Sequence, residues 1–501
     1  MNNRFTAIFT AVALIPALVA NAQTNYPESV AEVFHAADAS VKGGLPATPV
    51  IAVPMGNCCE KDLFDSIVKA GGVPVGIPAD ITSFNFLRDA AAGFDGFVMT
   101  DCFAEKMDSE AADSTAGELR PAIELIKAVV DRNVPVYGSS DLLVSIENGL
   151  ARSHTRYPSL DAFISKAGTY KKAKALMQRV YVLDSHNDQP CEYRDGASIG
   201  LRQNNLVSVP KMVEGYTDGS MVVSWIAQNE LDEKHTARAV KRCEWIIDQI
   251  HADAAKYPDV CGIATTEAEA RALKVEGKKA LFIGVENGYG IGNDISLIKK
   301  YRDKGMIYMT LCHSGDNAIC HTSAGGSHEG DEGVTKFGKK VIRELNKCGV
   351  VIDLSHANEA SFWDAIKYSK APIVCTHSGA AALYGHDRNL TDEQLKALAE
   401  NGGVCQVYIV SGFMSDDPSK FTVDLMIDHI MHCIEVAGID HVGIGTDFDG
   451  GGAAVDINGD NDMINITVKL LERGLSEKDI EKIWGTNFFR VMGEAQKLAV
   501  K

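Results

Sequence analysis

The fold is decided by the stretch VVIDLSHANEASFWDAIKYSKAPIVCTHS (residues 350–378), in which two short apolar runs each lead into a histidine. The runs, VVIDLSH (350–356) and PIVCTHS (372–378), are of strand length and rich in Val and Ile, and the segment between them reads as a helix. A strand, a helix and a second strand form the unit that builds parallel sheets. The stretch therefore predicts two neighbouring parallel strands with His356 and His377 at their carboxyl ends.

Six further runs of the same kind occur outside this stretch. They are VYVLDSHND (180–188), MVVSWIAQ (221–228), ALFIGVEN (280–287), MIYMTLCHS (306–314), GVCQVYIV (403–410) and HVGIGTDFD (441–449). Most segments between them read as helices. Eight strand–helix units predict a closed (β/α)8 barrel of the TIM type, so we assign residues 180–501 to such a barrel and the chain to the α/β class. The active site of this barrel lies where its strands end.

Residues with metal-binding side chains stand at these strand ends. His186 and Asp188 end the first strand, and side chains two apart along a strand point the same way, so both can face one ion. Glu286 ends the third strand, and one carboxylate can bridge two divalent ions about 3.5–4 Å apart. Neutral imidazoles on neighbouring strands, such as His356 and His377, suit zinc. The pattern predicts a hydrolytic centre with two metal ions.

Further residues near the same rim are candidates for chemistry or substrate binding. Asp447 and Asp449 follow the last strand and point the same way, so the pattern alone leaves both open; Asp447 is nearer the strand body and is favoured as the proton carrier. His313 ends the fourth strand, where its side chain could polarise a carbonyl or stabilise an oxyanion. Arg388 follows the sixth strand and suits a substrate carboxylate, with a surface cation as the alternative. The glycine run Gly450–Gly452 would let a substrate approach closely.

The remaining composition sets limits on class and location. With 501 residues the chain is expected to have at least two domains, and its net charge of −18 argues against nucleic acid and anionic membrane surfaces as partners. Residues 1–22 read as a signal peptide, since Arg4 precedes the apolar run Phe9–Ala20 and an A-x-A cleavage pattern. No later segment reads as membrane-spanning. We expect an exported protein, periplasmic if the source is Gram-negative and extracellular otherwise.

Residues 23–150 carry a second strand–helix pattern and read as a small parallel α/β domain of the flavodoxin-like type. Its strands are expected in TPVIAVP (48–54), AGGVPVGIP (70–78), GFDGFVMTD (93–101) and NVPVYGSSD (133–141). These stretches resemble the class I glutamine amidotransferase-like fold, in particular its γ-glutamyl hydrolase branch. That family has a cysteine on the turn after the last strand, where this chain has only serines. We expect a non-catalytic domain, with a nucleophilic Ser140 as the alternative, and then a linker and helix over 151–179.

The barrel region resembles the renal (membrane) dipeptidase family of zinc peptidases, from about Val180 to about Met492. The motifs that carry the resemblance are SHNDQP, GVENG, TLCHS, VTKFGKKVIRELNKCGVVIDLSH, APIVCTHSGA, RNLTDEQL, HVGIGTDFDG and GTNFFRV. The resemblance implies two zinc ions that share one carboxylate. The first ion would be bound by His186, Asp188 and Glu286, and the second by Glu286, His356 and His377.

The same resemblance implies the remaining roles and the substrate. His313 and Arg388 would hold the substrate, and Asp447 rather than Asp449 would be the acid/base. The expected reaction is hydrolysis of dipeptides, including those with a D-residue on the leaving side, by attack of a metal-bridging hydroxide, and a homodimer is expected. The chain departs from the family pattern at two places that line the pocket and so affect the expected substrate range. It has GVENGYG where the family has GVEGG, and Cys191 where the family has an aromatic residue. The alternatives are a hydrolase of acylated amino acids or β-lactams, or an inactive barrel that only binds.

Overall fold

The computed structural model describes residues 172–500, apart from Arg202, Asn204, 327–331 and Asn458, together with Thr169 and five short strands nearer the N-terminus. The packing of the chain divides it into two compact units, Met1–Lys172 and Ala173–Lys501. Within the part of the chain described, no helix is both long enough and apolar enough to cross a membrane.

The five N-terminal strands form one parallel sheet in the order β2-β1-β3-β4-β5. The strands are β1 (Val50–Met55), β2 (Val73–Pro78), β3 (Gly96–Val98), β4 (Val136–Tyr137) and β5 (Arg156–Tyr157). The first four fall within the stretches predicted as strands. β5 lies within residues 151–179, which we predicted to be a linker and a helix; its two residues are too few to show a periodic pattern. The signal segment 1–22 and the Ser140 turn lie outside the described residues.

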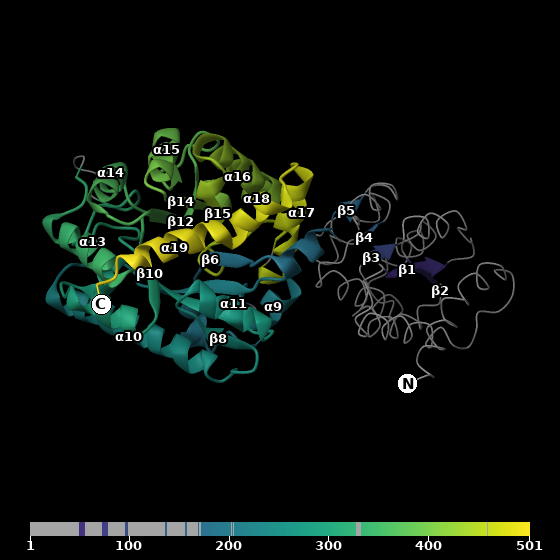
Figure 1. Cartoon of the computed structure of the whole chain (residues 1–501), viewed down its shortest axis with the longest axis horizontal. Helices are drawn as coiled ribbons and strands as arrows, with labels where there is room; N and C mark the ends of the chain where they lie inside the picture. Colours follow the sequence, from purple (N-terminus) through teal and green to yellow (C-terminus); the bar gives the residue numbers. More distant parts are fainter. Residues whose placement is uncertain are drawn as a thin grey trace, which may run out of the picture. The chain divides into compact units, whose positions relative to one another are not determined.

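All eight barrel strands occur where the apolar runs predicted them, each followed by helical segments (Figure 1). The strands are β6 (Leu183–Asn187), β7 (Gly219–Trp225), β9 (Lys279–Glu286), β10 (Met306–Thr310), β11 (Val351–Asp353), β12 (Ile373–Ala380), β14 (Val404–Val407) and β15 (Val442–Ile444). Each pairs with the next in parallel, in the order β6-β7-β9-β10-β11-β12-β14-β15.

The barrel closes between its first and last strands. Residue Asn187 forms a parallel bridge with Phe448, just beyond the end of β15. The backbone N–H of Asp188 donates to the carbonyl of Phe448 at 2.8 Å, and that of Asp447 donates to the carbonyl of His186 at 3.0 Å. These bonds join the two ends of the sheet directly beside the predicted metal ligands.

Two short strands were not predicted. β8 (Cys261–Ile263) lies along the first residues of β9, and β13 (Asn389–Leu390) extends the end of β12. Both are parallel to their neighbours. β13 matters for the site, because it fixes the loop that carries Arg388 against the carboxyl end of β12.

Helices surround the sheet and connect successive strands (Figure 1). The α-helices are α9 (Val209–Glu214), α10 (Glu233–Ala254), α11 (Glu267–Val275), α12 (Ser296–Asp303), α13 (Lys336–Cys348), α14 (Glu359–Tyr368), α15 (Asp392–Glu400), α16 (Val423–Ala437), α17 (Ile464–Glu472), α18 (Glu477–Glu481) and α19 (Asn487–Lys497). Shorter helical turns are η3 (Gln189–Asp195), η4 (Gly288–Ile291), η5 (Ser411–Phe413), η6 (Pro418–Lys420), η7 (Ile439–His441), η8 (Asp460–Asp462) and η9 (Lys482–Thr486).

Local sequence signals set the ends of these helices. α15 begins with a capping box, in which the Thr391 hydroxyl accepts from the Gln394 N–H and the Gln394 side chain accepts from the Thr391 N–H. α13 ends at Gly349, whose φ of 68° is the left-handed conformation that favours glycine. The chain then enters β11 directly, so this cap aims the strand that leads to His356.

The C-terminal helix seals the end of the barrel opposite the site. A buried apolar cluster joins Phe488, Phe489 and Met492 of α19 to the first residues of several strands, among them Leu183 of β6 and Val351 of β11. Burial of this size stabilises the amino ends of the strands, by roughly 1.5–3 kcal/mol for each large apolar side chain. The carboxyl ends are left free for chemistry, as is general in barrels of this type.

Candidate metal centre

Seven of the eight predicted site residues lie together at the carboxyl ends of the strands, and Arg388 lies beside them. His186, Glu286 and His377 belong to strands β6, β9 and β12, and the others follow a strand end by a few residues. All eight side chains are buried except that of His313, which is partly exposed. The sequence pattern predicts no distances, whereas the structure shows which atoms face each other.

Glu286 stands at the centre of the group. Its Oε1 lies 3.0 Å from His356 Nε2 and 3.4 Å from His377 Nε2, while its Oε2 lies 3.4 Å from His186 Nε2. Two ligand atoms bound to one tetrahedral zinc ion at about 2.0–2.1 Å lie about 3.3 Å apart. The spacings around each oxygen therefore match those of ligands on a common ion, with a different set of imidazoles on each oxygen.

Asp188 and Asp447 complete the side of the group that contains His186. His186 Nε2 lies 3.8 Å from Asp188 Oδ2 and 3.9 Å from Asp447 Oδ1. Both His186 Nε2 and Glu286 Oε2 are buried without a hydrogen-bond partner. Buried polar atoms are costly when they are unpaired, and a divalent cation between them would satisfy both. The residues present thus fit a metal ion, and the groups His186–Asp188–Asp447 and Glu286–His313–His356 are each close enough to hold one.

A network behind the imidazoles fixes their orientation. The Thr376 hydroxyl lies 2.9 Å from His377 Nδ1 and 3.2 Å from His186 Nδ1, and the Tyr308 hydroxyl lies 2.7 Å from the same His186 atom. Such contacts to the far nitrogen leave the other nitrogen free to face an ion. Sequence reasoning missed Thr376 and Tyr308, which each stand as a polar residue inside an apolar run.

Asp353 anchors that network. Its Oδ2 accepts from the hydroxyls of Thr376 and Thr310, and its Oδ1 accepts from the N–H groups of Ser355 and Thr376. Asp353 lies near His186 and His377 and could be counted as a ligand. Four donors already occupy its two oxygens, so its role is to position the network. A carboxylate inside the run VVIDLSH was the signal available in the sequence.

Asp447 and Asp449 have different partners, which separates two residues that the pattern left equivalent. Both carboxylate oxygens of Asp449 accept from backbone N–H groups, Oδ1 from Leu206 at 2.6 Å and Oδ2 from Val207 at 3.1 Å. Asp449 therefore fastens the loop before α9, whereas Asp447 faces His186. This geometry agrees with the choice of Asp447 that the resemblance implied.

Gly450, the first residue of the glycine run, packs against two carboxylates of the site. A Cβ on Gly450 would lie 2.0 Å from Asp188 Oδ2 and 2.5 Å from Asp447 Oδ1. The two carboxylates therefore require glycine at position 450. Close approach of a substrate to the run stays a prediction.

Burial and neighbouring charges shift the pKa values of Asp447 and Glu286 in opposite directions. Burial raises the pKa of the Asp447 carboxyl well above its usual value, and the charges of Asp188 and Glu286 add to the rise although His186 opposes it. Burial also acts to raise the pKa of Glu286, but its histidine neighbours, chiefly His186, hold it well below its usual value. An ionised Glu286 suits a ligand, and a raised pKa at Asp447 suits a group that carries a proton.

His313 and Arg388 border this group on the open side. The His313 ring lies 4.2 Å from the His356 ring and 5.5 Å from the Trp225 ring, centroid to centroid. Arg388 is 4% exposed and donates to the carbonyl of His377 at 3.2 Å, and its guanidinium lies over the rings of Tyr408 and Phe413. Arg388 is therefore a built part of the site and not a surface cation.

The comparison with protein families decides the identity of the barrel. The model of the membrane dipeptidase family, peptidase family M19, matches residues 170–501. The chain belongs to the membrane dipeptidase family. It is therefore an enzyme of the metallodipeptidase class, and the clusters of His, Asp and Glu side chains described above could hold the metal of such an enzyme. The match begins close to the boundary between the two units, so the N-terminal sheet and its resemblance to amidotransferases stay outside it.

Individual relatives agree with this membership in the dipeptidase family. Dipeptidase ataJ of Aspergillus terreus is 32% identical over 366 residues, which cover 66% of this chain and 88% of the relative. Among solved structures, the probable dipeptidase PvdM of Pseudomonas aeruginosa superposes with a TM-score of 0.62 at 23% identity, over 66% of this chain and 99% of that one. A metallopeptidase of Rhodobacter sphaeroides, solved with a phosphinate mimic of L-Ala-D-Ala, superposes with a TM-score of 0.58 at 22% identity, over 63% of this chain and 99% of that one. These structures share the barrel fold.

Proposed function

We propose that the barrel is a binuclear zinc dipeptidase. The proposal rests on the way the two carboxylate oxygens of Glu286 face different imidazoles. Oε2 faces His186, and Oε1 faces His356 and His377. A carboxylate shared in this way is the usual bridge between two hydrolytic metal ions. The first ion would be held by His186, Asp188 and Glu286, and the second by Glu286, His356 and His377. Imidazole and carboxylate ligands suit zinc.

The bound ions would supply Lewis-acid activation of a water molecule and of the scissile carbonyl. Asp447, whose Oδ1 lies 3.9 Å from His186 Nε2, would accept the proton of that water and pass it to the leaving amine. His313 is placed beside His356 to donate a hydrogen bond to the carbonyl oxygen as negative charge develops there. Asp447 and His313 thus have separate tasks in the same step.

Arg388 would select short substrates. Its guanidinium is held by the His377 carbonyl and by two aromatic rings, so its free Nε–H is fixed close to the ligand His377. A guanidinium binds a carboxylate well in such a buried position. A C-terminal carboxylate bound by Arg388 would limit the substrate to one residue after the scissile bond. Acceptance of a D-residue there is part of the proposal, and the ligand of the Rhodobacter sphaeroides relative supports it.

The test is hydrolysis of an L-L and L-D dipeptide panel by the full chain, as purified, after chelation, and after zinc is restored. We expect activity that disappears on chelation and returns with zinc, at about two zinc ions per chain by elemental analysis. No hydrolysis of any dipeptide with zinc bound would refute the proposal. One zinc per chain at full activity would refute its binuclear part.

Export through residues 1–22 and assembly into a homodimer are part of the same proposal. Both rest on the sequence pattern and on the resemblance. Fractionation of the source cells and sedimentation of the purified chain would test them.

A further inference from the structure

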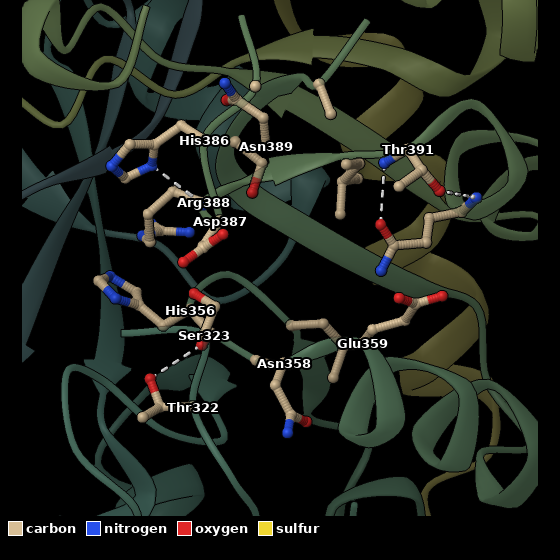
Figure 2. Close-up of a pocket in the computed structure, with 17 residues that line it drawn as sticks. Thr322, Ser323, His356, Asn358, Glu359, His386, Asp387, Arg388, Asn389 and Thr391 are labelled. Carbon is tan, nitrogen blue, oxygen red and sulfur yellow. Dashed lines mark hydrogen bonds between the residues drawn. The ribbon is translucent and has the colours of Figure 1, made fainter. Parts of the chain in front are cut away.

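A pocket opens beside the metal centre and shares two residues with it. The cavity holds about 440 Å³ and is bordered by the ends of β11 and β12, by the start of α14 and by the loop that leads into α15. His356 and Arg388 form its inner wall (Figure 2). Figure 2 shows these two residues on one side of the pocket and Glu359 and Thr391 on the other.

The inner wall presents buried donors that have no partner. His356 Nδ1, Arg388 Nε and Ser323 Oγ all lack a hydrogen bond, and their residues are 7%, 4% and 8% exposed. His356 Nε2 faces Glu286 and His377, so in the neutral ring the proton belongs on Nδ1. Three unpartnered donors at this depth are expected to meet a ligand or water, and their chemistry suits a carboxylate.

Two exposed carboxylates also line the pocket. Asp387 lies beside Arg388, and Glu359 lies on the opposite side (Figure 2). Asp387 forms no ion pair or hydrogen bond with another described residue, and Glu359 accepts only from the indole N–H of Trp363, at 3.2 Å. The remaining polar lining is already engaged, since Thr391 and Gln394 form the α15 cap and Asn358 caps α14. Two carboxylates are thus left available for a cation.

We propose that this pocket receives the C-terminal residue of a dipeptide whose side chain ends in a cation, such as lysine or ornithine. The proposal rests on the dipeptidase function and adds a substrate preference to it. The α-carboxylate would meet the donors of the inner wall, and the side-chain ammonium would lie between Asp387 and Glu359. A cavity of about 440 Å³ has space for a lysine side chain.

The test compares two substrates that differ in one charge, Ala-Lys and Ala-norleucine. We expect a higher kcat/KM for Ala-Lys. Glu359→Gln and Asp387→Asn should each lower kcat/KM for Ala-Lys by about threefold to fivefold, as is typical of partly exposed ion pairs, and leave Ala-norleucine unchanged. Glu393→Gln is the matched control, because Glu393 is an exposed carboxylate on α15 that does not line the pocket.

Equal rates for the two substrates, or variants that slow both alike, would overturn the pocket assignment while the dipeptidase function stands. If no dipeptide is hydrolysed, the dipeptidase function fails, and calorimetric titration with free L-lysine against L-norleucine tests the pocket alone. Binding of lysine that weakens in Glu359→Gln and Asp387→Asn supports the pocket. Equal affinity for lysine and norleucine, or no binding of either, contradicts it.

Discussion

Asp353 accepts a hydrogen bond of 2.7 Å from the hydroxyl of Thr376, and through it holds two imidazoles in place. The Thr376 hydroxyl lies within 3.2 Å of Nδ1 in both His186 and His377. One side chain therefore orients a proposed ligand of each zinc ion. Contacts of this kind contribute to metal affinity although they touch no metal.

Thr376→Val should weaken zinc binding by about 10- to 100-fold, because it keeps the shape of the side chain and removes the hydroxyl. Competition with a chromophoric chelator measures the change. Thr467→Val is the control, since Thr467 is a buried threonine whose hydroxyl serves Trp484, away from the proposed ligands. Unchanged zinc affinity in Thr376→Val would show that the imidazoles do not depend on this network.

Asp447→Asn should keep its zinc and lose turnover by about 100- to 10,000-fold, the usual contribution of a general acid or base. Asp449→Asn should behave differently, because the hydrogen bonds that the Asp449 carboxylate accepts within the described residues come from the backbone of Leu206 and Val207. Its loss should lower stability and leave kcat close to that of the wild type. The two variants are compared by zinc content, kcat and urea unfolding. Full turnover in Asp447→Asn would remove Asp447 from the mechanism.

Gly450→Ala should abolish metal binding at the His186 side, since the new methyl group would meet the carboxylates of Asp188 and Asp447 at less than 3 Å. Forced overpacking also lowers the free energy of unfolding by about 1–3 kcal/mol. Gly493→Ala provides the contrast, because Gly493 lies in α19 with open space around it and should gain about 0.5–1 kcal/mol. Zinc content measures the effect on metal binding, and urea unfolding measures the effect on stability, in each variant. Normal zinc content in Gly450→Ala would contradict the geometry.

His429 should make the fold sensitive to mild acid. Burial lowers the pKa of this histidine to about 4, and its Nδ1 accepts from the N–H of Ala380 at 3.0 Å. The unfolded chain binds a proton below pH about 6.5 while the folded chain does not until about 4, so stability is complete above 6.5 and falls as the pH drops between these values. The loss from this group reaches about 2 kcal/mol at pH 5.

Urea unfolding at pH 7.5 and pH 5, with zinc saturating, tests the role of His429. His429→Asn keeps an acceptor near the Nδ1 position and cannot be protonated. We expect it to lose less stability between the two pH values than the wild type does. An equal loss in both proteins would assign the acid sensitivity to other groups.

The barrel and the predicted ligand cluster could be read from the sequence because each strand is an apolar run that ends in a polar residue. The short strand β13 could not be predicted, since Asn389 and Leu390 show no periodicity and pair only because β12 lies beside them. Sequence order also hides contacts between distant segments. The hydrogen bonds between Asp449 and the backbone of Leu206 and Val207 join residues more than 200 positions apart, and no pattern in the sequence near Asp449 predicts them.

The unpartnered donors on the inner wall of the pocket could not be predicted either. Ser323 is an ordinary loop residue in the sequence, and its unpartnered hydroxyl becomes visible only when the β11 and β12 loops are placed around it. The role of Asp353 could be predicted only in part. A carboxylate within an apolar strand indicates a functional residue, but only the four donors around Asp353 show that it orients the site.

The bond from the Asp447 backbone to that of His186 ties the last strand of the barrel to the first. A ribosome must therefore synthesise nearly the entire chain before these two residues can meet. Closure of the barrel, and with it the placement of Asp447 beside His186, therefore comes late in the synthesis of the chain. A fragment that ends before residue 447 would keep all five proposed ligands in its sequence and still lack the residue that moves the proton.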